Sequence, residues 1–290
     1  MSLYKYLLIC SLAGLFLFSC GLVHDKPQEA TRMYWIREDL QLPRRDLRCA
    51  LTQDPAGTAQ TVIANLNFRP DPFSLKIDSV GRKIYMIDGD GWDKILRANL
   101  DGTVLETIVN GTDIYSLCLD AARNRLYWIE TDKIRRGNLD GSGAEDVFEH
   151  PDNALISWLA IDLQKNQLYF STGIHISRIN SDGTELTTIF DSSVQRGLEF
   201  DSRNRRLVWV PDLAIQGFRQ SDPDGHNPVI VNIGENPNKG FTLDPSGSIF
   251  FVGFGPIADT INRCDQDGTG KTTLYTEEGD FNIYGVALLF

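Results

Sequence analysis

Residues 125–141 read RLYWIETDKIRRGNLDG, and similar strings occur four more times along the chain. The other copies are KIYMIDGDGWDKILRANLDG from Lys83, QLYFSTGIHISRINSDG from Gln167, RLVWVPDLAIQGFRQSDPDG from Arg206 and SIFFVGFGPIADTINRCDQDG from Ser248. Each copy joins an aromatic segment to a segment that carries an arginine and ends at Asp-Gly. Five copies of one pattern indicate a repeating structural unit.

The spacing of the copies identifies the kind of repeat. An aspartate after an apolar strand marks each unit, and successive markers are 42, 42, 39 and 43 residues apart. Repeats of this length that contain several short strands are typical of β-propeller blades. The marker aspartates are Asp78, Asp120, Asp162, Asp201 and Asp244.

Each unit predicts four strands. An apolar strand leads to the marker aspartate, an aromatic strand and an arginine strand follow, and a fourth strand completes the blade. The Asp-Gly pair suits the turn before the fourth strand, because glycine adopts positive φ freely and aspartate hydrogen-bonds the local backbone. The glycines of these turns are Gly102, Gly141, Gly183, Gly225 and Gly268.

The two ends of the chain each contain part of one more unit. Residues 283–288, IYGVAL, match a first strand, and residues 33–63 match the other three, with Tyr34 and Trp35 in the aromatic strand and Gly57 at the turn. Joining them closes a ring and protects the sheet edges. We therefore predict an all-β, six-bladed β-propeller over residues 33–290, whose last blade combines one C-terminal strand with three N-terminal strands.

The repeat resembles the YWTD propellers of the low-density-lipoprotein-receptor family over essentially all of residues 33–290. The matching segments are NRLYWIE at 124–130 and IRRGNLDGS at 134–142, together with one arginine in every unit. The acid that ends the motif is kept in only two units, so the uniform hydrogen bonding between blades that the resemblance implies is not expected throughout. The arginines are Arg48, Arg97, Arg136, Arg178, Arg219 and Arg263, and we expect them to be structural because six copies lie around a ring.

The N-terminal residues have the layout of a secretory signal. Lys5 precedes an apolar run from Leu7 to Phe18 that is too short for an ordinary membrane-spanning helix. The LFSC string at 17–20 resembles the lipobox of bacterial lipoproteins, which implies a signal peptide over 1–19, lipidation of Cys20 and a tether over 20–32. We then expect a lipoprotein of the bacterial cell envelope, at the outer membrane or cell surface. A plain cleaved signal, giving a periplasmic or secreted protein, and an uncleaved anchor are the alternatives.

The net charge limits the expected partners, and the number of cysteines limits the expected disulfides. The formal net charge is −11, and such a surface repels nucleic acid and anionic headgroups, so only the lipid anchor is expected to contact a membrane. Beyond the leader, Cys49, Cys118 and Cys264 are an odd number with no close pair, which argues against a disulfide framework. We expect a monomer.

Catalytic motifs are absent from the sequence. Its four histidines are scattered, and no HExxH, GxSxG or paired-cysteine pattern is present. The Asp-Gly turns do not match the calcium-binding loop, so neither a metal nor another cofactor is expected. These observations favour a binding role over catalysis. A periplasmic lactonase- or lyase-like hydrolase that uses the central channel is the alternative, by analogy of fold alone.

Departures from the repeat suggest a binding face. The residue four before the marker is small in five units and is Trp158 in the third, where it either plugs the channel mouth or walls a pocket. Trp92 lies in a short loop at the same end and either binds a partner or folds back onto its own blade. We predict a non-catalytic module that recognises a protein or surface glycan through this face. The candidate residues are Phe73, Trp92, Tyr115, Trp158, Arg196, Lys239, Phe254 and Tyr284.

A second column should line the channel. The residues two before the markers are Lys76, Cys118, Ala160, Glu199, Thr242 and, in the closing unit, Ala287. The charged members belong to blades one and four, which face each other in a six-membered ring. We predict that Lys76 and Glu199 point into the channel and form a structural pair, because either charge buried alone would be costly. A ligand-binding role for the pair is the alternative.

Overall fold

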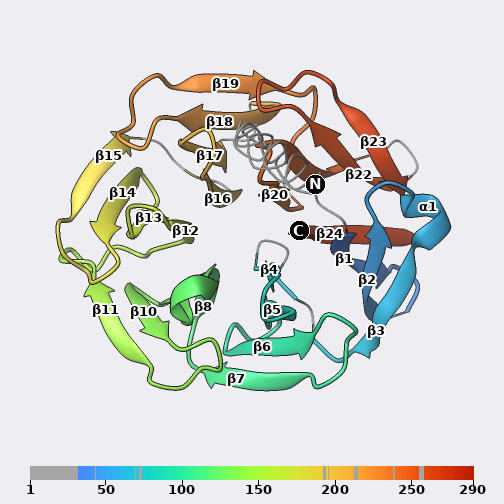
Figure 1. Ribbon diagram of the computed structural model, residues 1–290, viewed down its shortest axis with the longest axis horizontal. Helices are drawn as coiled ribbons and strands as arrows, with labels where there is room; N and C mark the ends of the chain where they lie inside the picture. The colour runs from blue at the N-terminus through green and yellow to red at the C-terminus, as the bar shows by residue number, and fades with distance from the viewer. Residues whose placement is uncertain are drawn as a thin grey trace, which may run out of the picture.

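The computed structural model describes residues 32–290, except residues 43, 69, 72–73, 192–193, 195, 212–214, 238 and 255–257. Six four-stranded antiparallel sheets surround a central axis (Figure 1). The predicted six-bladed β-propeller is therefore confirmed.

Each blade runs outward from the axis, and its four strands are named here in blade order one to six. The innermost strands are β4 (Lys76–Asp78), β8 (Ile114–Asp120), β12 (Trp158–Asp162), β16 (Arg196–Asp201), β20 (Phe241–Leu243) and β24 (Phe281–Leu289). The second strands are β5 (Lys83–Ile87), β9 (Arg125–Glu130), β13 (Gln167–Ser171), β17 (Arg206–Val210), β21 (Ile249–Phe254) and β1 (Arg32–Asp39). The third strands are β6 (Lys94–Asn99), β10 (Lys133–Gly137), β14 (His175–Asn180), β18 (Gly217–Ser221), β22 (Asp259–Cys264) and β2 (Arg45–Leu51). The outermost strands are β7 (Glu106–Asn110), β11 (Glu145–Glu149), β15 (Thr187–Asp191), β19 (Val229–Asn232), β23 (Thr272–Thr276) and β3 (Gln60–Leu66).

The core lies between the blades, and the aromatic second strands fill it. Neighbouring blades cover both faces of a second strand, so these strands are continuously apolar rather than alternating. Trp35, Trp128 and Trp209 are fully buried there. The packing of one blade on the next, rather than a single central core, therefore stabilises the ring.

The marker aspartates fix the turn between the first and second strands. All five are buried, and their carboxylates accept hydrogen bonds from backbone N–H groups of the turn. Asp78, for example, accepts from the N–H groups of Val80 at 3.0 Å and Gly81 at 2.8 Å. In blade two, Asp120 caps the 3₁₀ turn η1 (Ala121–Arg123) in the same way. Satisfied backbone donors explain why a buried carboxylate is tolerated at this position.

Two members of the arginine column join neighbouring blades, in keeping with the structural role expected for the column. Arg97 pairs with Glu106 of its own blade and donates to the carbonyl oxygen of Leu139 in the next blade at 2.9 Å. Arg136 likewise donates to the Ser181 carbonyl at 3.2 Å, one blade further on.

The sixth blade has the predicted composition, in the order β24, β1, β2, β3. Tyr34 of β1 lies opposite Ala287 of β24. Strand β1 begins at Arg32, so the last residue of the expected tether belongs to the blade.

The prediction of a simple turn at Gly57 is wrong, because a short helix lies there. The four-residue helix α1 (Pro55–Thr58) takes its place, with the Asp54 side chain accepting from the Gly57 N–H at 3.1 Å. Proline at the first helical position favours this conformation, because its fixed φ suits a helix.

Binding-face pocket and central channel

The propeller has two different ends. We call loop face the end that carries the loops from second to third strands and from fourth to first strands, including residues 88–93 and 150–157. We call turn face the opposite end, which carries the marker aspartates and the Asp-Gly turns. Four predicted binding residues meet on the loop face: Trp92, Tyr115, Trp158 and Arg196 line one pocket of about 290 Å³.

Trp92 is held by its backbone in the left-handed region, with φ of +54°. Its N–H donates to the Asp88 carbonyl at 2.7 Å, and its carbonyl accepts from the Ile114 N–H at 2.6 Å. These bonds connect blade one to the first strand of blade two and offset the unfavourable φ. The half-buried indole packs against the hydrophobic cluster between these blades and also lines the pocket. Binding of a partner by Trp92 stays a prediction.

Tyr115 forms the adjoining wall. Its ring centroid lies 5.5 Å from that of Trp92 at an angle of 45° between the ring planes. Burial and the nearby Asp113 carboxylate raise the pKa of the Tyr115 phenol. The phenol is therefore neutral at physiological pH and can donate a hydrogen bond to a ligand.

Trp158 begins β12 and lies opposite Ser171 in the register of β13. Its indole packs against the cluster between blades three and four and also against the cluster between blades four and five. Trp158 thus lies at the loop-face end of the inner strands and lines the pocket. The residue is only partly buried.

Arg196 adds positive charge to the pocket edge. It is exposed at the start of β16, and it forms no ion pair with any other residue that the structure describes. The buried residues Asp71, Ile156 and Val194 also line the pocket. Aromatic, apolar and charged residues of both signs give the pocket distinct recognition chemistry.

Lys239, Phe254 and Tyr284 form a second group on the loop face. The Lys239 Nζ lies 2.6 Å from Asp259 Oδ2 and donates to Asn282 Oδ1 at 3.1 Å. It also lies 4.5 Å from the centroid of the Phe254 ring and 5.1 Å from that of Tyr284. Lys239, a binding-face candidate, is thus enclosed and paired, whereas Phe254 is half exposed.

Several exposed apolar side chains of the loop face were not among the sequence candidates. Their signal was a large apolar residue in a loop without strand alternation. They are Leu40, Leu42, Leu155 and Ile174. Two of the predicted residues, Phe73 and Cys20, lie outside the described residues.

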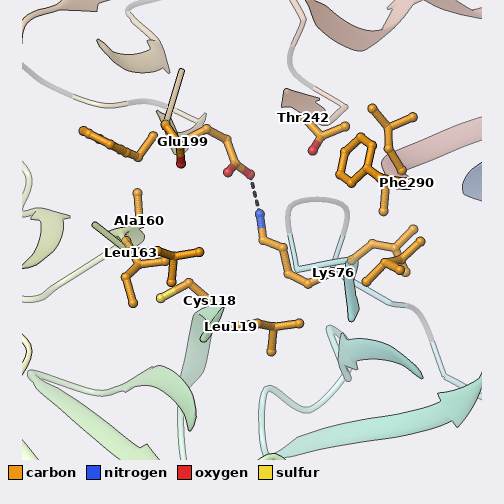
Figure 2. A pocket seen from close by; sticks show the side chains of 15 residues that line it. Lys76, Cys118, Leu119, Ala160, Leu163, Glu199, Thr242 and Phe290 are labelled. Atoms are coloured by element: carbon orange, nitrogen blue, oxygen red, sulfur yellow. Dashed lines mark hydrogen bonds and ion pairs between the residues drawn. The ribbon is translucent and has the colours of Figure 1, made fainter. Parts of the chain in front are cut away.

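The central channel contains the second predicted constellation. All six members of the channel column line one cavity of about 210 Å³. The Lys76 ammonium of β4 and the Glu199 carboxylate of β16 form an ion pair across the axis (Figure 2). The two side chains are 19% and 22% exposed, so the pair is partly solvated. Burial raises the pKa of the neighbouring Cys118 thiol, which keeps it protonated.

Two features are absent from the residues that the structure describes. No group of three or more His, Cys, Asp and Glu side chains among them is placed to hold a metal ion. No helix among them is both long and apolar enough to cross a membrane.

Comparisons with known proteins support the fold. A scan against protein families finds no match. A chain from a nidogen–laminin complex is 15% identical with a TM-score of 0.72, over 89% of this chain and 98% of that chain. TolB from Acinetobacter baumannii is 11% identical with a TM-score of 0.73, over 89% of this chain and 66% of its own. A protein of unknown function from Bacteroides thetaiotaomicron is 14% identical with a TM-score of 0.56, over 86% and 80%. At such identities the likeness shows a shared fold and no shared activity.

Proposed function

We propose that the protein is a non-catalytic binding module that recognises another protein through its loop face. One observation carries this proposal: the aromatic pocket and a set of exposed apolar side chains share that face. Aromatic residues and arginine are enriched at protein interfaces, and the exposed apolar side chains of the same face add surface that a partner can cover.

The exposed side chains lie on three blades of the same face, and one of them, Leu155, lines the pocket itself. Leu40 and Leu42 belong to blade six, Leu155 and Ile174 to blade three, and Phe254 to blade five, and each is at least half exposed. A partner that covered them would remove large apolar side chains from water, each worth about 1.5–3 kcal/mol when fully buried. The aromatic pocket would then accept one anchoring side chain, as at interface hot spots.

Arg196 suggests the charge of the partner. It is exposed at the pocket edge of a protein whose formal net charge is −11. A carboxylate placed there would form a charge-assisted hydrogen bond, which favours a partner with an acidic group beside its apolar anchor.

A surface glycan is the second candidate, because the walls formed by Trp92, Tyr115 and Trp158 can stack against a sugar ring. The similar structure from the nidogen–laminin complex supports the protein partner, since it shows a chain of this fold within a protein complex.

Affinity capture with two matched double variants tests the proposal. Leu155→Ser with Phe254→Ser changes the loop face, whereas Val80→Ser with Leu186→Ser changes exposed apolar residues of the turn face. The tagged full-length protein and both variants are incubated with an envelope extract. We expect the loop-face variant to lose a specific protein that the wild type and the turn-face variant both capture. Equal capture by both variants would contradict the proposal, and glycan binding without protein capture would make a glycan the partner.

We further propose that the protein is held at the bacterial cell envelope by a lipid on Cys20. The lipobox resemblance supports this location, and the similarity to TolB is compatible with it. Cys20→Ala should move the protein from the membrane fraction to the soluble fraction, as measured by immunoblot. Retention of the variant in the membrane fraction would rule out the lipid anchor.

A further inference from the structure

We propose that the central channel binds a small amphoteric molecule, an α-amino acid with an apolar side chain, by exchange of the Lys76–Glu199 ion pair. The ligand carboxylate would replace Glu199 as the partner of Lys76, and the ligand ammonium would replace Lys76 as the partner of Glu199. This site is separate from the loop face and does not depend on the partner proposed there.

The first argument is space beside the pair. The other four positions of the channel column are small, and a cavity of about 210 Å³ is left around the two charges. Because both charged side chains are partly exposed, a small molecule can reach this space from solvent. The small residues are Cys118, Ala160, Thr242 and Ala287.

The second argument is charge. An anion alone would pair with Lys76 and leave Glu199 without its cation, and a cation alone would strand Lys76. Leaving one partner of a partly buried pair unmatched is strongly unfavourable. An amphoteric ligand satisfies both charges at once, so the channel selects against molecules that carry a single charge.

The third argument is the chemistry of the walls. Leu119, Leu163 and Phe290 surround the charged centre with apolar surface (Figure 2). Such a wall suits the side chain of leucine better than that of a polar amino acid. Thr242 adds a hydroxyl group that can accept from an ammonium or donate to a carboxylate.

The position of the cavity indicates where a ligand enters. Leu163 and Ser202 follow the inner strands β12 and β16 at the turn face, and both line the cavity. Trp158 lies at the loop-face end of β12. A ligand would therefore enter from the turn face.

Isothermal titration of the full-length protein with four probes tests the proposal. Leucine carries both charges, 4-methylvalerate carries only the carboxylate, isoamylamine carries only the ammonium, and glycine lacks the apolar side chain. We expect saturable binding of leucine, and binding of each analogue weaker by about tenfold or more. Absence of leucine binding at millimolar concentration would overturn the proposal, as would analogues that bind as tightly as leucine.

Two variants test whether leucine binding depends on the Lys76–Glu199 ion pair. Lys76→Met with Glu199→Gln removes both charges without stranding either, so the protein should fold, as shown by its melting curve, and lose leucine binding. Leu186→Ser, an exposed position before the outermost strand of blade three, is the control and should bind leucine as the wild type does. Leucine binding that survives in the folded double variant would show that the pair is structural only.

Discussion

The absence of a side chain at Gly141 lets the turn of blade two lie close to the backbone of blade one. Gly141 has a φ of +81°, and a Cβ atom built on it would lie 1.9 Å from the carbonyl oxygen of Ile108 in the preceding blade. Four other blades have a glycine at the same turn, with φ between +80° and +88°. The turn therefore requires glycine for two independent reasons, its backbone conformation and the backbone of its neighbour.

Gly141→Ala should lower the free energy of unfolding by about 3 kcal/mol or more, because left-handed φ alone costs about 1–2 kcal/mol for alanine. Chemical denaturation followed by circular dichroism measures the loss. Gly173→Ala is the control, since no atom lies within 4 Å of the added Cβ, and it should change the stability by less than about 0.5 kcal/mol. Similar losses in the two variants would contradict the contact with Ile108.

Sequence reasoning could identify the Asp-Gly turn because φ is a local property, but not the contact with Ile108, which needs the neighbouring blade. The positions of Lys76 and Glu199 could be predicted because the repeat and six-fold arrangement place them on one ring. The enclosure of Lys239 could not be predicted. Its partner Asp259 follows a loop whose sequence departs from the repeat.

The Lys76–Glu199 pair predicts a non-additive mutant cycle in the absence of ligand. Lys76→Met strands the Glu199 carboxylate and should cost about 2 kcal/mol, less than for a fully buried pair because both side chains contact solvent. Adding Glu199→Gln removes the stranded charge, so the double variant should be more stable than Lys76→Met alone. Denaturation of the wild type, both single variants and the double variant measures the coupling. Additive losses would refute the energetic pairing.

At the scale of elements, a buried carboxylate joins blades three and four. Asp162 at the end of β12 is fully buried, and Arg205, in the turn between β16 and β17, pairs with both of its oxygens. Burial by itself would raise the pKa of Asp162, but the Arg205 guanidinium and two backbone N–H groups outweigh it and lower this pKa. The pair therefore stabilises the folded state where Asp162 is ionised.

Arg205→Gln should lower the free energy of unfolding by about 3 kcal/mol at neutral pH, because it leaves a buried carboxylate without its cation. Because the folded-state pKa of Asp162 is lowered, the stabilisation is present above the unfolded value near 3.8 and is lost as pH falls through the folded value. The difference between wild type and variant should thus shrink on acidification below about pH 4. Urea denaturation at several pH values measures it, and a difference that is constant down to pH 2 would contradict the pairing.

At the scale of the whole molecule, the sequence repeat was sufficient to predict the ring and its closure, because a strand pattern at each end of the chain completes a sixth unit. The loop-face pocket was only partly predictable. Trp92, Tyr115, Trp158 and Arg196 could be nominated from their departures from the repeat, but their convergence depends on loop conformations such as the positive φ of Trp92. Loops depart from the repeat, so repeat symmetry does not constrain them.

A buried carboxylate reinforces the closure between blades five and six. Glu277, only 3% exposed, follows β23 and accepts hydrogen bonds from the Trp35 indole at 3.4 Å and the Arg48 guanidinium at 3.0 Å. Trp35 and Arg48 belong to the N-terminal strands β1 and β2, so this contact joins segments that are far apart in the sequence. Closure of the ring thus depends on both ends of the chain.

Deletion of residues 281–290 tests the closure. It removes β24, which pairs with β1 and is the inner strand of blade six. Ile283, Val286 and Leu288 are buried between blades five and six, and their loss would cost about 4.5–9 kcal/mol at about 1.5–3 kcal/mol each. This is comparable to the whole stability of a typical domain, so the truncated protein should unfold globally.

Thermal melting and hydrogen exchange distinguish global from local loss in the truncated protein. We expect a large fall in Tm and fast exchange even in β13 of blade three, on the opposite side of the ring (Figure 1). A synthetic peptide of residues 281–290 should restore part of the transition, because it can pair with the exposed edge of β1. An unchanged Tm, or fast exchange confined to blade six, would show that the ring does not need its C-terminal strand.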